Sequence, residues 1–292
     1  MANHTLTVND KFFSFETWDQ IYQTYLKEVL VNGETFTGRN GLTRSVFGSS
    51  VKVDLRNGFP LTALRKLPFK NIIREFLFDI GTNTNVEALG EAKHFWSFLA
   101  DENGWLGASA YNRGWRQWPP SKPDSEVPNE RLITDGAVDQ LHRVTELLKD
   151  LPNTRHATVI THNPTAVGVG CPPCHPMWQM MPNGEYLDMM VPARSNDLVI
   201  GFPLDIPRYA IILTVMAKMT GFTPRFIYMP SSNTHIYENC FGITNELMAR
   251  ECDGDPALSV NKREFSSWDD IQLEDFELNF YDPHPSIKVS VN

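Results

Sequence analysis

The sequence is short of cysteine and contains no long hydrophobic run. Its 292 residues include only four cysteines, too few for the disulfide framework of a small secreted protein. No stretch approaches the roughly 20 apolar residues that a membrane-spanning helix needs. Residues 1–11 are polar and lack the charged and then apolar layout of a secretion signal. These absences predict a soluble, cytoplasmic protein without membrane contact.

Clusters of positive charge are also missing from the chain. The net charge is −9, and the 26 lysines and arginines are scattered. Proteins that bind nucleic acids usually gather such residues into a run or onto one face, so we expect no nucleic-acid partner. A single nucleotide is compatible with this composition, because a few local arginines can bind one phosphate within an acidic protein.

The rest of the composition is that of an ordinary globular protein with a large core, 41% hydrophobic and 21% charged. Residues 105–130 hold four prolines and are predicted to be irregular. The mixture predicts an α+β fold with a mainly antiparallel or mixed sheet. Spacing predicts helices over 14–31, 70–81, 135–149 and 204–220. Alternation predicts strands over 45–55, 156–161, 177–181, 185–191 and 225–229.

The segment Cys171-Pro172-Pro173-Cys174-His175 is the most suggestive short motif. Cys-x-x-Cys-His is the pattern of c-type haem attachment, but that chemistry normally follows a signal peptide. A zinc site needs a second ligand pair at matching spacing, which Cys240 and Cys252 do not supply. A redox dithiol, a single nucleophilic cysteine beside a histidine, and structural cysteines on a turn are the other interpretations. The motif alone does not choose among them.

Eight short segments, taken together, decide in favour of the nucleophile. They are Gly58-Phe59-Pro60-Leu61, Ile72-Ile73-Arg74-Glu75, Ala100-Asp101-Glu102-Asn103-Gly104, Pro173-Cys174-His175, Arg194-Ser195-Asn196-Asp197, Gly201-Phe202-Pro203, Thr234-His235-Ile236-Tyr237 and Tyr281-Asp282-Pro283-His284-Pro285. In this order and at nearly this spacing, they resemble the thymidylate synthases and their relatives, the pyrimidine-nucleotide hydroxymethylases. The match runs from about residue 36 to the C-terminus.

The resemblance implies a fold, an assembly and two small-molecule partners. The fold is α+β, a single catalytic domain with a large mixed sheet and flanking helices. The assembly is a homodimer formed through the sheet, in which each active site borrows residues from the other subunit. The partners are a pyrimidine nucleoside monophosphate and the folate co-substrate 5,10-methylenetetrahydrofolate, and no metal is expected. Residues 1–35 are then an N-terminal extension with a helix, and residues 36–292 the catalytic domain.

The resemblance also assigns the catalytic residues. Cys174 is the nucleophile that adds to carbon-6 of the pyrimidine and thereby makes carbon-5 reactive, and its thiolate needs positive surroundings. Glu75 resembles a buried glutamate that moves protons near the base. Tyr111 matches the tyrosine associated with removal of the carbon-5 proton, although Asn112 follows it where the family usually has glycine. His175 is expected to order the water network.

The phosphate ligands implied by the resemblance are mostly arginines. Arg39 matches an arginine of a mobile loop. Arg155 matches the first of two arginines contributed across the dimer interface, and His156 stands in the second place. Histidine in place of this arginine weakens phosphate binding or makes phosphate binding depend on pH. The other substrate contacts are Arg194, Ser195 and Asn196, with His235 and Tyr237 at the sugar 3′-hydroxyl.

Four residues match the folate side of the family's site. Trp96 and Asp197 match folate contacts, and Val291 lies in the C-terminal tail that closes over the site. Leu99 stands where the synthases carry a second tryptophan. The hydroxymethylases also have a smaller aliphatic residue there, and losing the aromatic ring loosens the folate and admits water. Leu99 therefore favours a hydroxymethyl product over a methyl product.

The choice of base is predicted from Asp205, in Gly201-Phe202-Pro203-Leu204-Asp205. Synthases that act on uracil have asparagine at this position, and the family's deoxycytidylate hydroxymethylases have aspartate. A carboxylate only accepts hydrogen bonds, so it repels a 4-oxo group and suits a 4-amino group. The predicted activity is hydroxymethylation of dCMP. Alternatives are a dUMP or CMP hydroxymethylase, a thymidylate synthase, a dCMP C5-methylase and, outside enzymes, a nucleotide- or RNA-binding regulator.

Overall fold

A large mixed sheet forms the centre of the molecule. The computed structural model describes residues 3–38, 40–107, 110–118, 137–164, 171–251 and 254–289. The strands of this sheet are β1 (His4–Val8), β2 (Lys11–Phe15), β3 (Glu34–Gly38), β4 (Gly41–Asp54), β5 (Thr158–Ile160), β6 (Met177–Asn183), β7 (Tyr186–Met190), β8 (Asn196–Asp197) and β9 (Thr223–Tyr237). Their spatial order is β2-β1-β4-β9-β7-β6-β5, with β3 beside β4 and β8 beside β9.

The long strands β4 and β9 are the axis of the sheet. They pair antiparallel from Thr43 opposite Tyr237 to Asp54 opposite Phe226. On its other edge β9 runs parallel to β7 and β8. In the β8–β9 pairing, Asp197 stands opposite His235. The sheet therefore places β8 beside the C-terminal end of β9.

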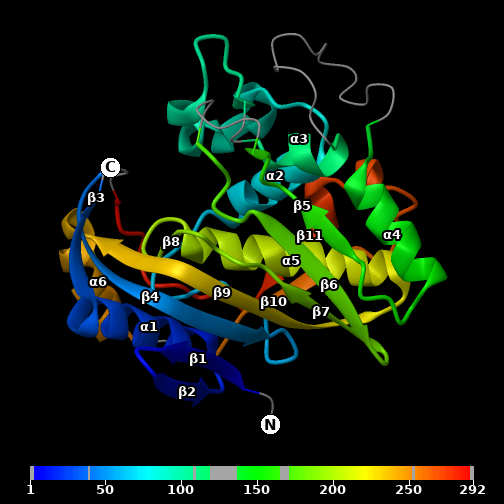
Figure 1. Ribbon diagram of the computed structural model, residues 1–292. Helices are drawn as coiled ribbons and strands as arrows, with labels where there is room; N and C mark the ends of the chain where they lie inside the picture. Colours follow the sequence, from blue (N-terminus) through cyan, green and yellow to red (C-terminus); the bar gives the residue numbers. More distant parts are fainter. Residues whose placement is uncertain are drawn as a thin grey trace.

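Helices flank this sheet (Figure 1). Helix α5 runs behind strands β6 and β7 in that view and packs against β7 and β9. It is apolar on nearly every side, which explains its burial. Among the described residues, no helix is long and apolar enough to cross a bilayer. The helices are α1 (Trp18–Asn32), α2 (Phe69–Ile80), α3 (Tyr111–Arg116), α4 (Gln140–Asp150), α5 (Phe202–Thr220) and α6 (Phe241–Ala249), with a separate hairpin of β10 (Ala257–Val260) and β11 (Phe276–Asn279).

An aromatic cluster joins α1 to α5 inside the core. Trp18, Tyr22 and Tyr25 lie on one face of α1 and are fully buried. The ring centroids of Trp18 and Tyr25 each lie 5.7 Å from that of Phe202 at the start of α5. Burial of such rings contributes much of the stability of a core. The N-terminal helix is thus packed into the same core as the central helix.

The predicted fold class is confirmed, and most predicted elements are present. The helix predicted over 14–31 is wrong at its start, because residues 11–15 alternate and pair with β1, and the helix begins at Trp18. The region predicted to be irregular over 105–130 contains helix α3, and residues 108–109 and 119–130 lie outside the described residues. Strand β1 pairs with β4, so residues 4–8 belong to the same sheet as residues 41–54. The domain boundary at residue 35 stays a prediction.

Candidate active site

The loop that carries Cys174 is held by Arg194. The backbone N–H of Arg194 donates to the carbonyl of Cys174 at 2.9 Å, and its Nε donates to the carbonyl of Pro173 at 2.9 Å. The Nη2 of Arg194 donates to the carbonyl of Pro172 and lies 3.8 Å from the Sγ of Cys171. Neither cysteine of the motif forms a disulfide bond. One arginine therefore fixes the backbone on both sides of the thiol.

The thiol of Cys174 is largely buried, which opposes its ionisation. Burial raises the pKa of Cys174 to about 11, against the lowering effect of the Arg194 guanidinium, and the Asp205 carboxylate raises this pKa further. The sequence predicts positive surroundings for this residue, and Arg194 is indeed close, but desolvation outweighs it. In this structure Cys174 is a neutral thiol near pH 7.

His175 lies on the inner side of the same loop. Its side chain is buried, its Nδ1 lies 3.3 Å from the Tyr111 hydroxyl, and its ring packs edge-on against Tyr209. Its Nε2 is 3.9 Å from Oδ2 of Asp205, too far for a hydrogen bond. Burial lowers the pKa of His175 to about 4. The ring is therefore neutral at physiological pH and carries one N–H and one acceptor nitrogen.

Helix α3 places Tyr111 against this loop. The backbone N–H of His175 donates to the Tyr111 hydroxyl at 3.4 Å, and the ring of Trp96 packs edge-on against the tyrosine ring. The next residue, Asn112, donates from Nδ2 to the carbonyls of Phe78 and Asn83 at 3.0 and 2.8 Å. In place of the family's glycine, Asn112 thus ties α3 to the end of α2 and satisfies carbonyls there.

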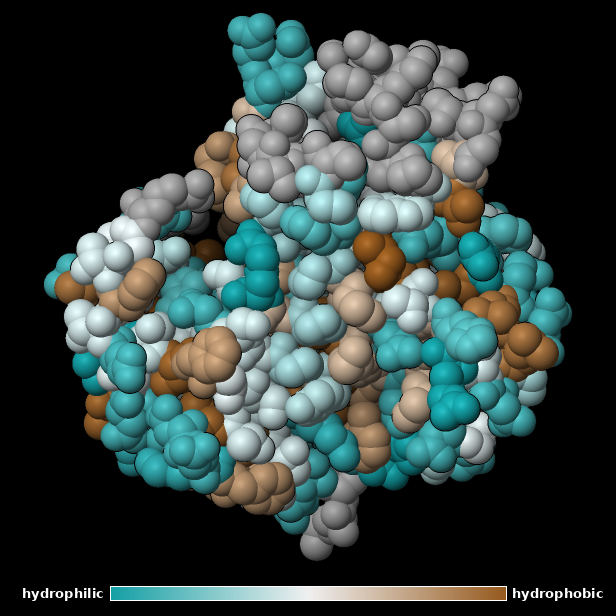
Figure 2. All heavy atoms as spheres, in the orientation of Figure 1, coloured by the Kyte–Doolittle hydropathy of each residue, from teal (hydrophilic) through white to brown (hydrophobic). Residues whose placement is uncertain are grey.

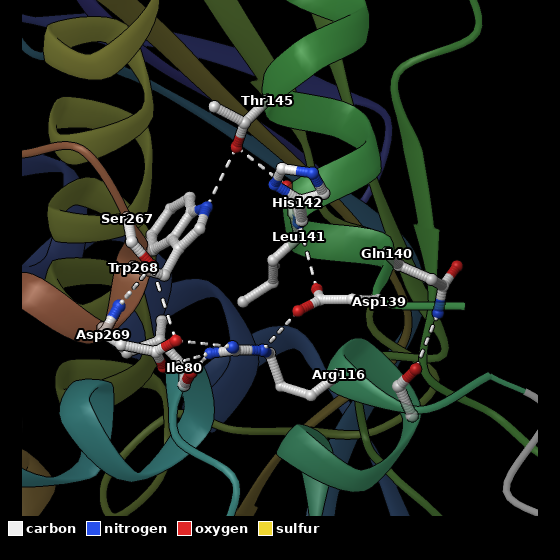
Figure 3. A network of polar contacts seen from close by, with 11 residues as sticks. Ile80, Arg116, Asp139, Gln140, Leu141, His142, Thr145, Ser267, Trp268 and Asp269 are labelled. Carbon is white, nitrogen blue, oxygen red and sulfur yellow. Dashed lines mark hydrogen bonds and ion pairs between the residues drawn. The ribbon is translucent and has the colours of Figure 1, made fainter. Parts of the chain in front are cut away.

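Arg116 anchors the other end of α3 (Figure 3). Its Nε donates to Asp139 at 2.9 Å, its Nη1 donates to Asp269 at 2.9 Å and to the Ile80 carbonyl. The other oxygen of Asp139 accepts from the backbone N–H of His142 and so caps α4. The network joins α2, α3, α4 and the Trp268–Asp270 turn, and it fixes the helix that carries Tyr111.

A buried charge cluster lies between α2 and α5, at the base of the loop. Arg208 is 2% exposed, and its Nη2 donates to Oδ1 of Asp205 at 2.8 Å. Its Nη1 donates to Oε2 of Glu75 at 3.3 Å, and its Nε lies 3.4 Å from Oδ2 of Asp79. Glu75 and Asp79 are one helical turn apart on α2, as Asp205 and Arg208 are on α5. Glu75 and Asp205 were predicted as site residues, whereas Arg208 and Asp79 were not.

The cluster contains three carboxylates and one guanidinium, so it retains protons near neutral pH. Burial raises the pKa of Glu75 to about 7, with Arg208 opposing and Asp79 adding to the rise. Burial likewise raises the pKa of Asp79 to about 7 against the effect of Arg208. Burial alone lowers the pKa of Arg208, but the surrounding carboxylates more than reverse this and keep it protonated.

The residues predicted for the sugar and the folate form a second group at the β8–β9 pairing. Burial lowers the pKa of His235, whose Nδ1 lies 2.8 Å from Oδ1 of Asn233 and whose ring lies 5.0 Å from that of Tyr237. Oδ1 of Asp197 accepts from two backbone N–H groups just before α5, and burial raises its pKa. Asn196 donates to Ser231 at 3.3 Å.

Gly201 is the point where the two groups meet. A Cβ at this position would lie 3.4 Å from Oδ2 of Asp205 and 3.9 Å from the Cβ of Asp197. Oδ2 of Asp205 therefore borders the space next to Gly201, with the charge cluster on one side and the β8–β9 group on the other. The side chain of Asp205 is 21% exposed, so this carboxylate is less buried than Glu75 and Asp79.

The remaining predicted residues lie apart from this centre or outside the described ranges. Arg155 and His156 are exposed before β5, and neither forms an ion pair within the described part of the chain. Trp96 and Leu99 pack half-buried in a small second core beside α2. Ser195 is half-buried between Arg194 and Asn196. Arg39 and Val291 lie outside the described residues.

Trp96 and Asp197 have side chains of the kind that a folate requires. Trp96 is half-buried and offers an aromatic ring, and Asp197 offers a carboxylate whose Oδ1 accepts from two backbone N–H groups. A flat heterocycle with N–H groups suits an aromatic ring and a carboxylate. Within the described ranges, no group of three or more His, Cys, Asp or Glu residues could hold a metal ion.

A comparison with known protein families bears on this site. The model of the family described as thymidylate synthase matches residues 20–292. The matched span begins in α1, includes every predicted site residue and covers more than nine-tenths of the chain. The chain therefore belongs to the thymidylate synthase family.

Proposed function

We propose that this protein is a deoxycytidylate hydroxymethylase that transfers a one-carbon unit to carbon-5 of dCMP with addition of water. Membership of the family supports the coarser statement, a folate-dependent one-carbon transfer to a pyrimidine nucleotide. The observation that carries the finer proposal is the position of the Asp205 carboxylate, whose Oδ2 lies 3.9 Å from Nε2 of His175 in the Cys174 loop. When bound, 5,10-methylenetetrahydrofolate supplies the one-carbon unit, and Trp96, Leu99 and Asp197 are the residues proposed to hold it.

Asp205 is proposed to select the base by accepting a hydrogen bond from the 4-amino group of cytosine. Its Oδ1 already accepts from Arg208, so Oδ2 is the oxygen turned toward the space beside Gly201. A uracil would place its 4-oxo group against this negative charge. A mispaired buried polar group costs about 1–3 kcal/mol, which supports roughly tenfold to hundredfold discrimination.

Formation of the Cys174 adduct is proposed to depend on nucleotide binding. The buried thiol is neutral in the free protein, so its proton must leave as sulfur bonds to carbon-6. Ring nitrogen 3 of the cytosine gains electron density as sulfur attacks carbon-6, and it takes up a proton. The proton that the thiol loses is thus balanced by the proton that ring nitrogen 3 gains. Glu75, with a pKa of about 7, can give or take a proton near neutral pH.

The protein is proposed to work as a homodimer formed through the open face of the sheet. On this face Phe47 is 89% exposed, and Tyr228 and Met181 are also exposed. Phe47 and Tyr228 line a hollow of about 420 Å³ together with Arg194 and Ser231. Figure 2 shows hydrophobic groups interrupting the hydrophilic surface on the near side of the molecule. In a dimer, Arg155 of each subunit is proposed to reach the nucleotide phosphate of the other.

The test is mass analysis of the product from dCMP, CMP and dUMP, each incubated with 5,10-methylenetetrahydrofolate. The expected result is a gain of CH2O by dCMP and a much slower reaction of the other two nucleotides. The Cys174→Ala variant should be inactive, and its matched control Cys171→Ala should keep most activity. A gain of CH2, or a reaction of dUMP alone, would contradict the proposal. Binding without turnover of any nucleotide would favour a regulator.

A further inference from the structure

We infer that Arg208 is a positioning residue that sets base selectivity, by holding one oxygen of Asp205 and so fixing the orientation of this carboxylate. The inference rests on the proposed function, in which Asp205 contacts the base. Arg208 itself is 2% exposed and points its three nitrogen groups at three acidic residues. It therefore acts through Asp205 and does not need to touch the nucleotide.

The geometry leaves only one oxygen of Asp205 for the substrate. The 2.8 Å bond from Nη2 of Arg208 holds Oδ1, while Oδ2 lies on the side of His175 and Gly201. A guanidinium is planar and presents its donors in a fixed fork. Its Nη1 donates to Glu75 and its Nε lies beside Asp79, and these contacts restrict rotation of the guanidinium about the side-chain bonds of Arg208. The carboxylate is thereby oriented by two residues of a different helix.

The contact between Arg208 and Asp205 is a charged hydrogen bond within a group of three acidic residues. Without the guanidinium, Oδ1 of Asp205 would lose its donor, and the carboxylate could turn about its side-chain bonds. The acceptor that meets the 4-amino group would then no longer be held in one position. Arg208 thus supports base selection by holding Asp205 in one orientation.

Asp79 has a supporting place in this arrangement. It is fully buried on α2, and its Oδ2 has the 3.4 Å ion pair with Arg208 but no hydrogen bond of good geometry. It balances the charge of the buried guanidinium and limits its rotation, and its contact with the cluster is through Arg208. Removing Arg208 alone would leave Asp79 as an uncompensated buried charge. The pair Arg208 and Asp79 is therefore best removed together.

The test measures kcat/KM for both dCMP and dUMP, by tritium release from carbon-5, in four proteins. They are the wild type, Asp205→Asn, the double variant Arg208→Gln with Asp79→Asn, and the matched control Asp79→Asn, which leaves Arg208 on Asp205. We expect the dCMP-to-dUMP ratio to fall about tenfold or more in the double variant, since a charged hydrogen bond is lost. The ratio should change by less than about threefold in Asp79→Asn.

The selectivity ratio separates positioning from a purely structural role, which would lower both values of kcat/KM alike. If the double variant does not fold, Arg208→Lys decides the question. One ammonium group cannot make the three contacts of the guanidinium, so the ratio of kcat/KM for dCMP to that for dUMP should again fall. A wild-type preference for dCMP that survives unchanged in the folded Arg208 variant overturns this inference alone. A wild-type preference for dUMP overturns both the inference and the proposed function.

Discussion

At the scale of single residues, the site is governed by burial. Desolvation acts on the thiol, the imidazole and the carboxyls in the same sense, because it disfavours whichever form is charged. It raises the pKa of Cys174 to about 11 and of Glu75 to about 7, and it lowers that of His175 to about 4. Before substrate binds, Cys174 and His175 are therefore neutral near pH 7, and Glu75 is partly protonated.

The first prediction concerns the reactivity of Cys174. In the Cys171→Ala background, alkylation of Cys174 by iodoacetamide should be slow near pH 7. It should keep accelerating beyond about pH 9, because only the thiolate reacts. Mass spectrometry of the modified peptide measures the rate, with Cys174→Ala as the blank. A rate that levels off below about pH 8 would show an activated thiolate in the free protein.

The second prediction concerns the pKa of Glu75. Asp79 raises this pKa by charge repulsion, so Asp79→Asn should let Glu75 lose its proton at lower pH. The limb of the kcat/KM profile that belongs to Glu75, near pH 7 in the wild type, should then move to the acid side. Glu146→Gln, a change at an exposed carboxylate on α4, serves as control. A limb that stays in place or moves to higher pH would contradict this assignment.

At the scale of elements, the sequence predicted those segments whose apolar spacing is regular. Helices α2 and α5 were placed within two residues, because both bury a long apolar face. Helix α3 was missed, since it has six residues, includes Gly114 and is followed by prolines. Its stability comes from contacts distant in sequence, chiefly the Arg116 network and Asn112. Tertiary anchors of this kind leave no local pattern to recognise.

The third prediction tests the anchor of α3. Arg116→Met should lower the free energy of unfolding by about 3 kcal/mol, because it leaves Asp139 and the Ile80 carbonyl without their partner. Urea denaturation followed by circular dichroism measures the change. Lys149→Ala removes an exposed pair on α4 and should have no measurable effect. Equal stability of both variants would mean that the network does not hold the helix.

At the scale of the whole molecule, the fold gathers side chains that are far apart in sequence. Glu75, Tyr111, Cys174 and Asp205 come from α2, α3, a loop and α5. The resemblance to a family identified these four residues. Their local sequence patterns alone could not have predicted that they lie in one site. Arg208 and Asp79 were not predicted, for a physical reason. Each is a charged residue on an otherwise apolar helix face, and the sequence does not show which residue it pairs with.

The fourth prediction tests whether two subunits share each site. Arg155→Ala and Cys174→Ala should each be nearly inactive as homodimers. After the two are mixed and allowed to exchange subunits, half of the sites in each heterodimer carry neither change, so activity should return. Phe47→Glu, which places a charge on the open sheet face, should prevent both dimerisation and this recovery. Analytical ultracentrifugation reports the assembly, and a mixture that stays inactive would contradict sharing through Arg155.

The most direct test of the central claim is a competition between two bases. Equal amounts of dCMP and dUMP are supplied with 5,10-methylenetetrahydrofolate, and the products are followed by mass spectrometry for the wild type and Asp205→Asn. If the carboxylate at position 205 selects a 4-amino group, the wild type consumes dCMP first and the variant consumes dUMP first. The same order of consumption in both proteins would contradict the account.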